Sequence, residues 1–302
     1  MTDTPEPIPA EPIPAEPIPA EPTPAEPTPA EPTQHYDSVV EAWAYLLGED
    51  LHYGFFESGN ESLVAATDAL TDQMLNEAML QEGLTVLDIG CGTGKAGCRI
   101  ARENACQLVG ISPSTRCIED ATELALRLGL ADSAYFRIGD GTRPEGADES
   151  FDRVWVMESS HLMDDKAALI RESARMLKPG GRLVLCDIML DHKLSLEQVI
   201  EYRDEFLLLR DVFGRAKMEP LSFYNEQLQA NKLEVVSSRN ITRETLATFD
   251  RWRQNAEQNQ TSVTALIGKT AWQQFIESCD VLETFWQQGI LGYGLVSAVK
   301  PS

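Results

Sequence analysis

Short apolar runs alternate with amphipathic stretches through the middle of the chain, and the two patterns differ in period. Strand-like runs cover residues 84–90, 106–112, 134–139, 151–158 and 181–190. Between them, apolar positions recur at the three- and four-residue spacing of a helix over residues 96–103, 114–128 and 166–177. Strands separated by helices of this length predict right-handed βαβ crossovers and a parallel sheet covered on both faces. The pattern therefore predicts an α/β fold.

Further elements flank this alternating region on both sides. Before it, helices are expected over about 36–47 and 61–81, with the aromatic segment LHYGFFE between them. After it, the pattern predicts helices over 196–213 and 222–232 and strands over 233–241 and 294–299. Between these last two strands, an aromatic-rich helical insertion is expected, with Trp252, Trp272, Phe275, Phe285 and Trp286.

The first 34 residues have a different composition from the rest. They repeat the pentapeptide EPIPA three times and EPTPA twice, and they hold 12 of the 17 prolines. Proline at every second or third position removes amide donors and leaves no route to helix or sheet. We therefore expect a disordered, Pro-rich tail over 1–34 and one folded domain over 35–302. The tail is interpreted as a solubilising segment or as a tether for a partner that the repeat does not identify.

Charge and cysteine usage narrow the class of protein. The net charge is −23, and outside the tail 41 acidic residues face 25 basic ones, which leaves −16. Such a surface repels a phosphate backbone and argues against a nucleic-acid partner. No apolar stretch is long enough to cross a membrane, and the first residues have neither a basic nor an apolar region of the kind found in signal peptides, so we expect no export signal. Six scattered cysteines without a CxxC pair favour reduced thiols in a cytoplasmic protein, without a zinc site or membrane insertion.

The first strand of the alternating region ends in the glycine-rich sequence VLDIGCGTGKAG. Glycines allow a tight turn and a close approach of backbone to a ligand, and the helix that follows points its N–H groups at the same place. Residues 92–97 satisfy the GxGxxG pattern of a dinucleotide site, so a nicotinamide oxidoreductase is one alternative. The acidic residue expected about 20 positions later for NAD is absent, and the second strand ends in Ser112 instead.

Asp88 stands two residues before the first glycine, and the resulting DxGxGxG pattern resembles the class I S-adenosylmethionine (SAM)-dependent methyltransferases. The resemblance implies a Rossmann-like, mostly parallel seven-stranded sheet with an antiparallel final pair of strands. It implies SAM as the cofactor and no metal ion. It also implies cofactor-binding residues on the glycine loop, at the end of the second strand and on the acidic loop after the third strand: Asp88, Gly90, Gly92, Gly94, Ser112, Asp140 and Gly141.

Three further stretches are similar to one subset of that family, which includes the rebeccamycin-type sugar O-methyltransferases and the tocopherol C-methyltransferases. They are LHYGFFE, VWVMESSHLMDD and ARMLKPGGRLVLCDIML. The resemblance implies an N-terminal lid over 35–82, although Tyr53, Phe55 and Phe56 are equally consistent with plain core. It also implies that His161 and Asp187, 26 residues apart, are catalytic. Adjacent parallel strands would bring both residues to one rim of the sheet.

The expected reaction is methyl transfer from SAM to a hydroxyl or carbon of a small-molecule specialised metabolite. His161 would accept the proton and Asp187 would orient the imidazole. A helical cap over about 191–230 and 243–288 would form the acceptor pocket. One alternative is C-methylation of a prenyl diphosphate, with Glu158 as the proton acceptor. Alternatives of another class are the nicotinamide oxidoreductase and a non-catalytic SAM-binding protein.

Overall fold

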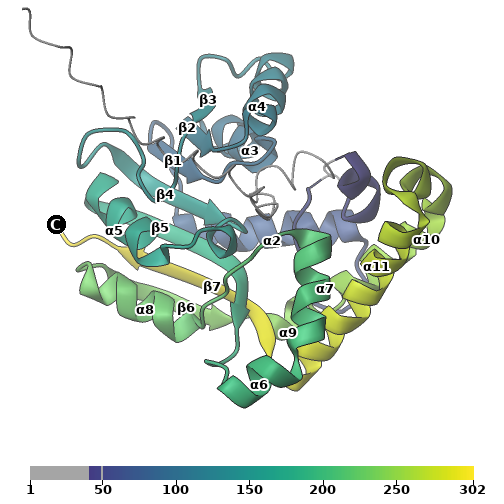
Figure 1. Ribbon diagram of the computed structural model, residues 1–302. Coiled ribbons are helices and arrows are strands. Elements are labelled where there is room, and N and C mark those ends of the chain that lie inside the picture. The colour runs from purple at the N-terminus through teal and green to yellow at the C-terminus, as the bar shows by residue number, and fades with distance from the viewer. Residues whose placement is uncertain (1–40, 49) are drawn as a thin grey trace, which may run out of the picture. The chain divides into compact units, whose positions relative to one another are not determined.

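The computed structural model describes residues 41–48 and 50–302, and it contains one seven-stranded sheet with the order β3-β2-β1-β4-β5-β7-β6 (Figure 1). The expected tail over 1–34 and the start of the first expected helix lie outside these residues. All neighbouring strands are parallel except β7, which is antiparallel to both β5 and β6. The strands are β1 Thr85–Ile89, β2 Gln107–Ser112, β3 Ala134–Ile138, β4 Phe151–Met157, β5 Leu177–Leu190, β6 Glu234–Asn240 and β7 Leu291–Val299.

Helices cover both faces of the sheet, as the βαβ pattern predicts. Side chains of α2, α3 and α4 pack with one set of strand residues, and side chains of α5 and α8 pack with the other set. Residues 41–46 are helical as well. The helices are α2 Leu63–Ala78, α3 Lys95–Asn104, α4 Thr115–Arg127, α5 Lys166–Met176 and α8 Leu221–Ala230, with a single 3₁₀ turn, η1 Ser160–Leu162, after β4.

Strand alternation decides which side chain reaches which layer. On β1, Val86 belongs to the cluster with α2 and α3, whereas Leu87 and Ile89 belong to the cluster with α5 and α8. Asp88 therefore points to the α2 and α3 side, since successive strand residues face opposite ways.

The remaining helices form the cap at one end of the sheet. They lie beside the described residues before α2, 41–48 and 50–62, which we call the N-terminal segment (Figure 1). The expected helix over 196–213 is two helices, because Tyr202 leaves helical geometry at φ −95° and ψ 19°. The fifth strand begins at Leu177, earlier than the expected 181, and Gly180 takes a positive φ within it. No helix among the described residues is long and apolar enough to span a membrane. The cap helices are α6 Leu196–Glu201, α7 Arg203–Phe213, α9 Thr242–Thr245, α10 Thr248–Gln258 and α11 Gln260–Gln288.

Candidate active site

A cleft of about 1300 Å³ opens at the carboxyl ends of β1, β2 and β4. This is the edge at which an open parallel sheet binds its ligand. Six of the seven residues expected to bind the cofactor line it, and Gly94 is the exception; Glu158 lines it too. His161 and Asp187 do not line the cleft, but Leu162, the neighbour of His161, does. The expected lining residues present are Asp88, Gly90, Gly92, Ser112, Asp140 and Gly141.

The glycine loop after β1 passes tightly under the end of β4. At Gly90, where φ is +78°, a Cβ atom would lie 2.2 Å from Cβ of Ser159, and the Ser159 hydroxyl donates a hydrogen bond to the Ile89 carbonyl. No side chain fits between these two segments. At Gly92, by contrast, a Cβ atom would meet nothing within 4 Å. Backbone is therefore exposed to the cleft at Gly92, where a ligand can approach it closely.

Gly94 packs between two helices. It is the residue before α3, with φ +79°, and its Cβ would lie 2.6 Å from Cβ of Ala121 on α4. Gly94 thus permits close packing of α3 on α4 and does not line the cleft.

Asp88 is the strongest sign that the cleft binds a cationic group. Its side chain is 2% exposed, and its Oδ2 atom has no hydrogen-bond partner. Burial raises the pKa of Asp88 to about 7. Leaving a buried carboxylate without a partner is costly, so such an atom indicates a group that the ligand supplies. The ammonium group of SAM fits this position.

Trp155 is a functional candidate that the sequence did not single out. On β4 it is the direct neighbour of Asp88 on β1, and both side chains face the α2 and α3 layer. Its indole Nε1 is also buried without a partner, although the residue lines the cleft. A tryptophan within an apolar strand is normally core, and only the orphaned donor distinguishes this one.

Ser112 and Asp140, both expected to bind the cofactor, lie at the end of β2 and on the loop after β3. Ser112 ends β2, is buried, and accepts a hydrogen bond from Ser114 N at 3.2 Å. Oδ1 of Asp140 accepts hydrogen bonds from both the backbone N–H and the hydroxyl of Thr142, at 2.8 and 2.7 Å. The carboxylate is therefore held in a defined orientation at the entrance of the cleft.

Glu158 follows β4 and is fixed by two donors from distant parts of the chain. Its Oε1 accepts hydrogen bonds from Tyr53 N at 2.9 Å and from the Tyr293 hydroxyl. Its backbone has a positive φ of 46°, a conformation that costs a non-glycine residue energy. Burial raises the pKa of Glu158 to about 7, against the opposing effect of those hydrogen bonds.

His161 and Asp187 are brought together as expected, from η1 and from the neighbouring strand β5. His161 Nδ1 lies 2.6 Å from Asp187 Oδ1. Burial lowers the pKa of His161, but the Asp187 and Glu158 carboxylates together raise it by more, and the net pKa lies above the ordinary value. Burial raises the pKa of Asp187, but His161 and the other donors lower it by more.

Asp187 is fully buried and accepts four hydrogen bonds, two at each oxygen. Oδ1 accepts from the His161 ring and from Ile188 N, and Oδ2 accepts from His161 N and from the Ser160 hydroxyl. Since the carboxylate is ionised, the His161 ring must donate through Nδ1. The lone pair then lies on Nε2, which is the form of imidazole that can accept a proton.

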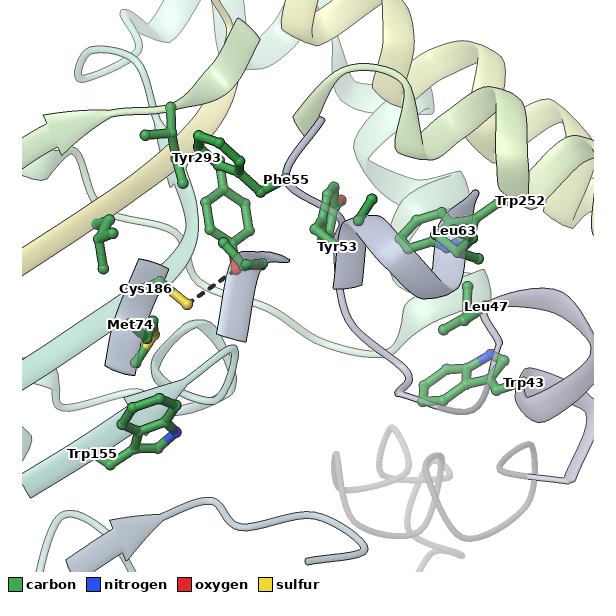
Figure 2. Packing of buried hydrophobic residues seen from close by; sticks show 14 of the residues in the cluster. Trp43, Leu47, Tyr53, Phe55, Leu63, Met74, Trp155, Cys186, Trp252 and Tyr293 are labelled. Atoms are coloured by element: carbon green, nitrogen blue, oxygen red, sulfur yellow. Dashed lines mark hydrogen bonds between the residues drawn. The ribbon is translucent and has the colours of Figure 1, made fainter. Parts of the chain in front are cut away.

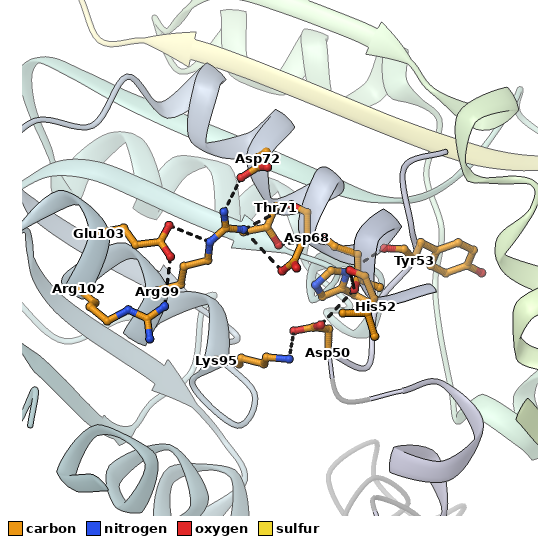
Figure 3. Close-up of polar contacts among 12 residues, drawn as sticks. Asp50, His52, Tyr53, Asp68, Thr71, Asp72, Lys95, Arg99, Arg102 and Glu103 are labelled. Carbon is orange, nitrogen blue, oxygen red and sulfur yellow. Dashed lines mark hydrogen bonds and ion pairs between the residues drawn. The ribbon is translucent and has the colours of Figure 1, made fainter. Parts of the chain in front are cut away.

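The N-terminal segment is tied to α3 by a polar cluster at the mouth of the cleft (Figure 3). The Asp50 carboxylate forms an ion pair with Lys95 Nζ at 2.8 Å and accepts a hydrogen bond from the Thr67 hydroxyl at 3.0 Å. Arg99 on α3 bonds Asp72 on α2 in the same cluster. These contacts hold the segment and α2 beside the loop that carries the glycines.

The aromatic residues of the LHYGFFE segment are buried and belong to the core that joins the cap to the sheet (Figure 2). Tyr53 stacks on Trp286 with a centroid distance of 5.5 Å, and it meets Trp252 edge-on at 4.9 Å. The Tyr53 backbone at the same time donates to Glu158. The LHYGFFE segment is therefore part of the hydrophobic core and also forms part of the cleft wall.

Comparisons with known proteins find one matching family and several relatives. A family model described as mycolic acid cyclopropane synthetase matches residues 25–290. The 27-O-demethylrifamycin SV methyltransferase of Amycolatopsis mediterranei (strain S699) is 32% identical over 268 residues, covering 88% of this chain and 95% of the relative.

Two solved structures superpose over nearly their whole length. The [4+2]-cyclase SpnF has a TM-score of 0.77 at 26% identity and covers 91% of this chain and 98% of its own. The mycolic acid cyclopropane synthase CmaA1, complexed with SAH and CTAB, has a TM-score of 0.80 at 18% identity, covering 89% and 97%. The second likeness shows the fold alone. The expected Rossmann-like fold is confirmed.

Proposed function

This chain belongs to the mycolic acid cyclopropane synthetase family of SAM-dependent methyltransferases, and from that premise we propose that it methylates a hydroxyl group of a specialised metabolite. Family membership confirms SAM as the cofactor and a small-molecule methyltransferase as the function class, over the nicotinamide oxidoreductase. The acidic surface further supports a small-molecule acceptor over a nucleic acid. Six buried cysteines that form no disulfide support a reducing cytoplasm.

The single observation that carries the hydroxyl assignment is the His161–Asp187 pair. SAM supplies an electrophilic methyl group when bound. His161 Nε2 accepts the hydroxyl proton of the acceptor as its oxygen becomes the nucleophile, and Asp187 stabilises the resulting imidazolium through Nδ1. Both groups are held by buried hydrogen bonds before the acceptor binds, so little reorganisation is needed.

Four basic side chains of the cap, all between residues 203 and 220, argue against a prenyl diphosphate as the acceptor. Each of the four between residues 203 and 220 already has a carboxylate within 3.8 Å; Arg215, for example, bonds Asp164 at 3.1 Å. A diphosphate requires several cations that can turn toward it. Glu158, the base of that alternative, already accepts two hydrogen bonds at Oε1. Both observations favour a hydroxyl acceptor.

The proposal is tested by incubating the full-length protein with SAM carrying a deuterated methyl group and a panel of acceptors. The panel contains 27-O-demethylrifamycin SV, sugar and phenol hydroxyl compounds, and geranyl diphosphate. We expect a deuterated methyl ether in at least one hydroxyl product, identified by mass spectrometry and fragmentation. Exclusive labelling of carbon in the diphosphate would overturn the hydroxyl assignment. A rearranged acceptor without label would instead indicate a cyclase like the one with which the chain shares its fold.

A further inference from the structure

We propose that Tyr224 and Ser160 are positioning residues that tune the basicity of His161 through Asp187. The inference rests on the proposed role of His161 as the base. It adds two hydroxyl groups behind the pair, one of them from α8, a helix in the layer that the Asp187 side chain faces.

The three groups form a continuous hydrogen-bonded chain in the interior. The Tyr224 hydroxyl lies 2.7 Å from Ser160 Oγ, and Ser160 Oγ lies 2.5 Å from Asp187 Oδ2. All three residues are 0% exposed. Tyr224 comes from α8, Ser160 from η1 and Asp187 from β5, so the chain joins three separate elements at the back of the site.

Proton counting fixes the direction of this chain. Asp187 is ionised and can only accept, so the one proton of Ser160 points at Oδ2. Ser160 Oγ must then accept from Tyr224, whose hydroxyl is the donor of their hydrogen bond. Burial and the nearby Asp187 raise the pKa of Tyr224, so the phenol keeps its proton. Each donor therefore draws electron density away from the Asp187 oxygen.

The other charged groups around the pair are few. Glu158, just after β4, raises the pKa of His161 and Lys166 on α5 lowers it, while Glu219 faces Tyr224. None of these three lies in the chain from Tyr224 to Asp187. Removing a hydroxyl from the chain leaves the Asp187 charge more concentrated and its attraction for the imidazolium stronger.

This stronger attraction fixes the direction in which the His161 pKa should move. Loss of either hydroxyl should raise the pKa of His161, because the carboxylate beside it becomes more basic. Ser160 bonds the carboxylate directly, and a hydrogen bond to a charged group is stronger than one between neutral groups. We therefore expect Ser160→Ala to raise the His161 pKa by about one unit and Tyr224→Phe by about 0.3 units.

The test titrates the imidazole itself by NMR in the full-length protein, with carbon-13 in the histidine rings. The chain has four histidines, and the His161 signal is assigned by its loss in His161→Gln. Ser173→Ala is the matched control, since Ser173 is a fully buried serine whose hydroxyl has no hydrogen-bond partner. Thermal unfolding of each variant checks that it is folded.

The expected order of the His161 pKa is wild type, then Tyr224→Phe, then Ser160→Ala, with Ser173→Ala equal to wild type. An unchanged pKa in folded Tyr224→Phe and Ser160→Ala, or a lowered one, overturns the proposal. If Tyr224→Phe does not fold, Ser160→Ala alone decides by the same criterion. The titration needs no acceptor, so it is independent of whether His161 is the base, which the loss of turnover in a His161 variant tests separately.

Discussion

Asp88 and Trp155 are cross-strand neighbours that both line the cleft, and each carries a buried polar atom without a partner. One is an acceptor and the other a donor. A cofactor with an amino-acid end brings both a cation and an anion, so a single bound molecule can satisfy both atoms, directly or through a water. We infer that this part of the cleft receives the methionyl end of SAM.

Trp155→Phe is expected to weaken binding of SAM and of S-adenosylhomocysteine by about three- to tenfold, since it removes one hydrogen-bond donor and keeps an aromatic ring. Calorimetry measures both affinities. The matched control is Trp252→Phe, because Trp252 also has a buried indole N–H without a partner but lies away from the cleft. Equal affinities in wild type and Trp155→Phe, or equal losses in the two variants, would show that the indole N–H does not serve the cofactor.

Binding of SAM at pH 6 is expected to release close to one proton. Burial holds the pKa of Asp88 at about 7, so the carboxyl is mostly protonated at pH 6, and a bound ammonium favours its ionised form. SAM affinity should accordingly rise with pH up to about 7. Calorimetry in buffers of different ionisation enthalpy counts the protons.

Glu158 also has a pKa of about 7 and lines the cleft, so it provides the control for this experiment. Proton release should persist in Glu158→Gln and disappear in Asp88→Asn. If proton release on SAM binding persisted in Asp88→Asn, the released proton would come from another group.

Gly94→Ala is expected to act on stability and leave SAM affinity unchanged. The left-handed backbone costs about 1–2 kcal/mol, and the close approach to Ala121 adds about 1–3 kcal/mol of overpacking. Adding Ala121→Gly should restore only the overpacking part. Chemical denaturation measures these differences.

Gly92→Ala serves as the comparison, because Gly92 lines the cleft and its Cβ would meet nothing. It should weaken SAM binding with a smaller loss of stability. A Gly94→Ala protein of normal stability that fails to bind SAM would contradict the packing role.

The β–α alternation made the sheet, its covered faces and the cleft predictable, because period and strand-end position are local properties of the sequence. The break in the helix at Tyr202 and the early start of β5 at Leu177 could not be predicted from the sequence, since tertiary contacts decide where an element ends. The packing of Gly94 against Ala121 was not predictable either, because the sequence of a glycine motif does not show which glycine faces a ligand and which faces a helix.

The missed residues share one property: their roles depend on contacts between distant segments. Trp155 sits in an apolar run that is typical of core. Ser160 and Tyr224 are 64 positions apart and meet because the chain at the start of α8 pairs with the end of β5. No periodicity in the sequence marks such a pair.

Turnover of Glu158→Gln distinguishes a reaction in which a hydroxyl acceptor loses the proton from one in which a carbocation loses it. If the acceptor is a hydroxyl, the amide still accepts from Tyr53 N, and turnover should fall by less than tenfold. If methylation creates a carbocation, the carboxylate is the base and turnover should stall. Initial rates with an identified acceptor, at saturating SAM, distinguish these outcomes.

The central claim is that His161 removes the acceptor proton, and turnover of His161→Gln with an identified hydroxyl acceptor tests it most directly. The variant should lose about 10²–10⁴-fold in kcat, the usual contribution of a general base. Its affinity for SAM should stay unchanged, because His161 does not line the cofactor cleft. In the wild type, kcat/KM should fall as pH drops through a pKa above 6.5, since the base must be unprotonated and Asp187 raises its pKa. A loss of less than tenfold in kcat, with SAM binding intact, would contradict the account.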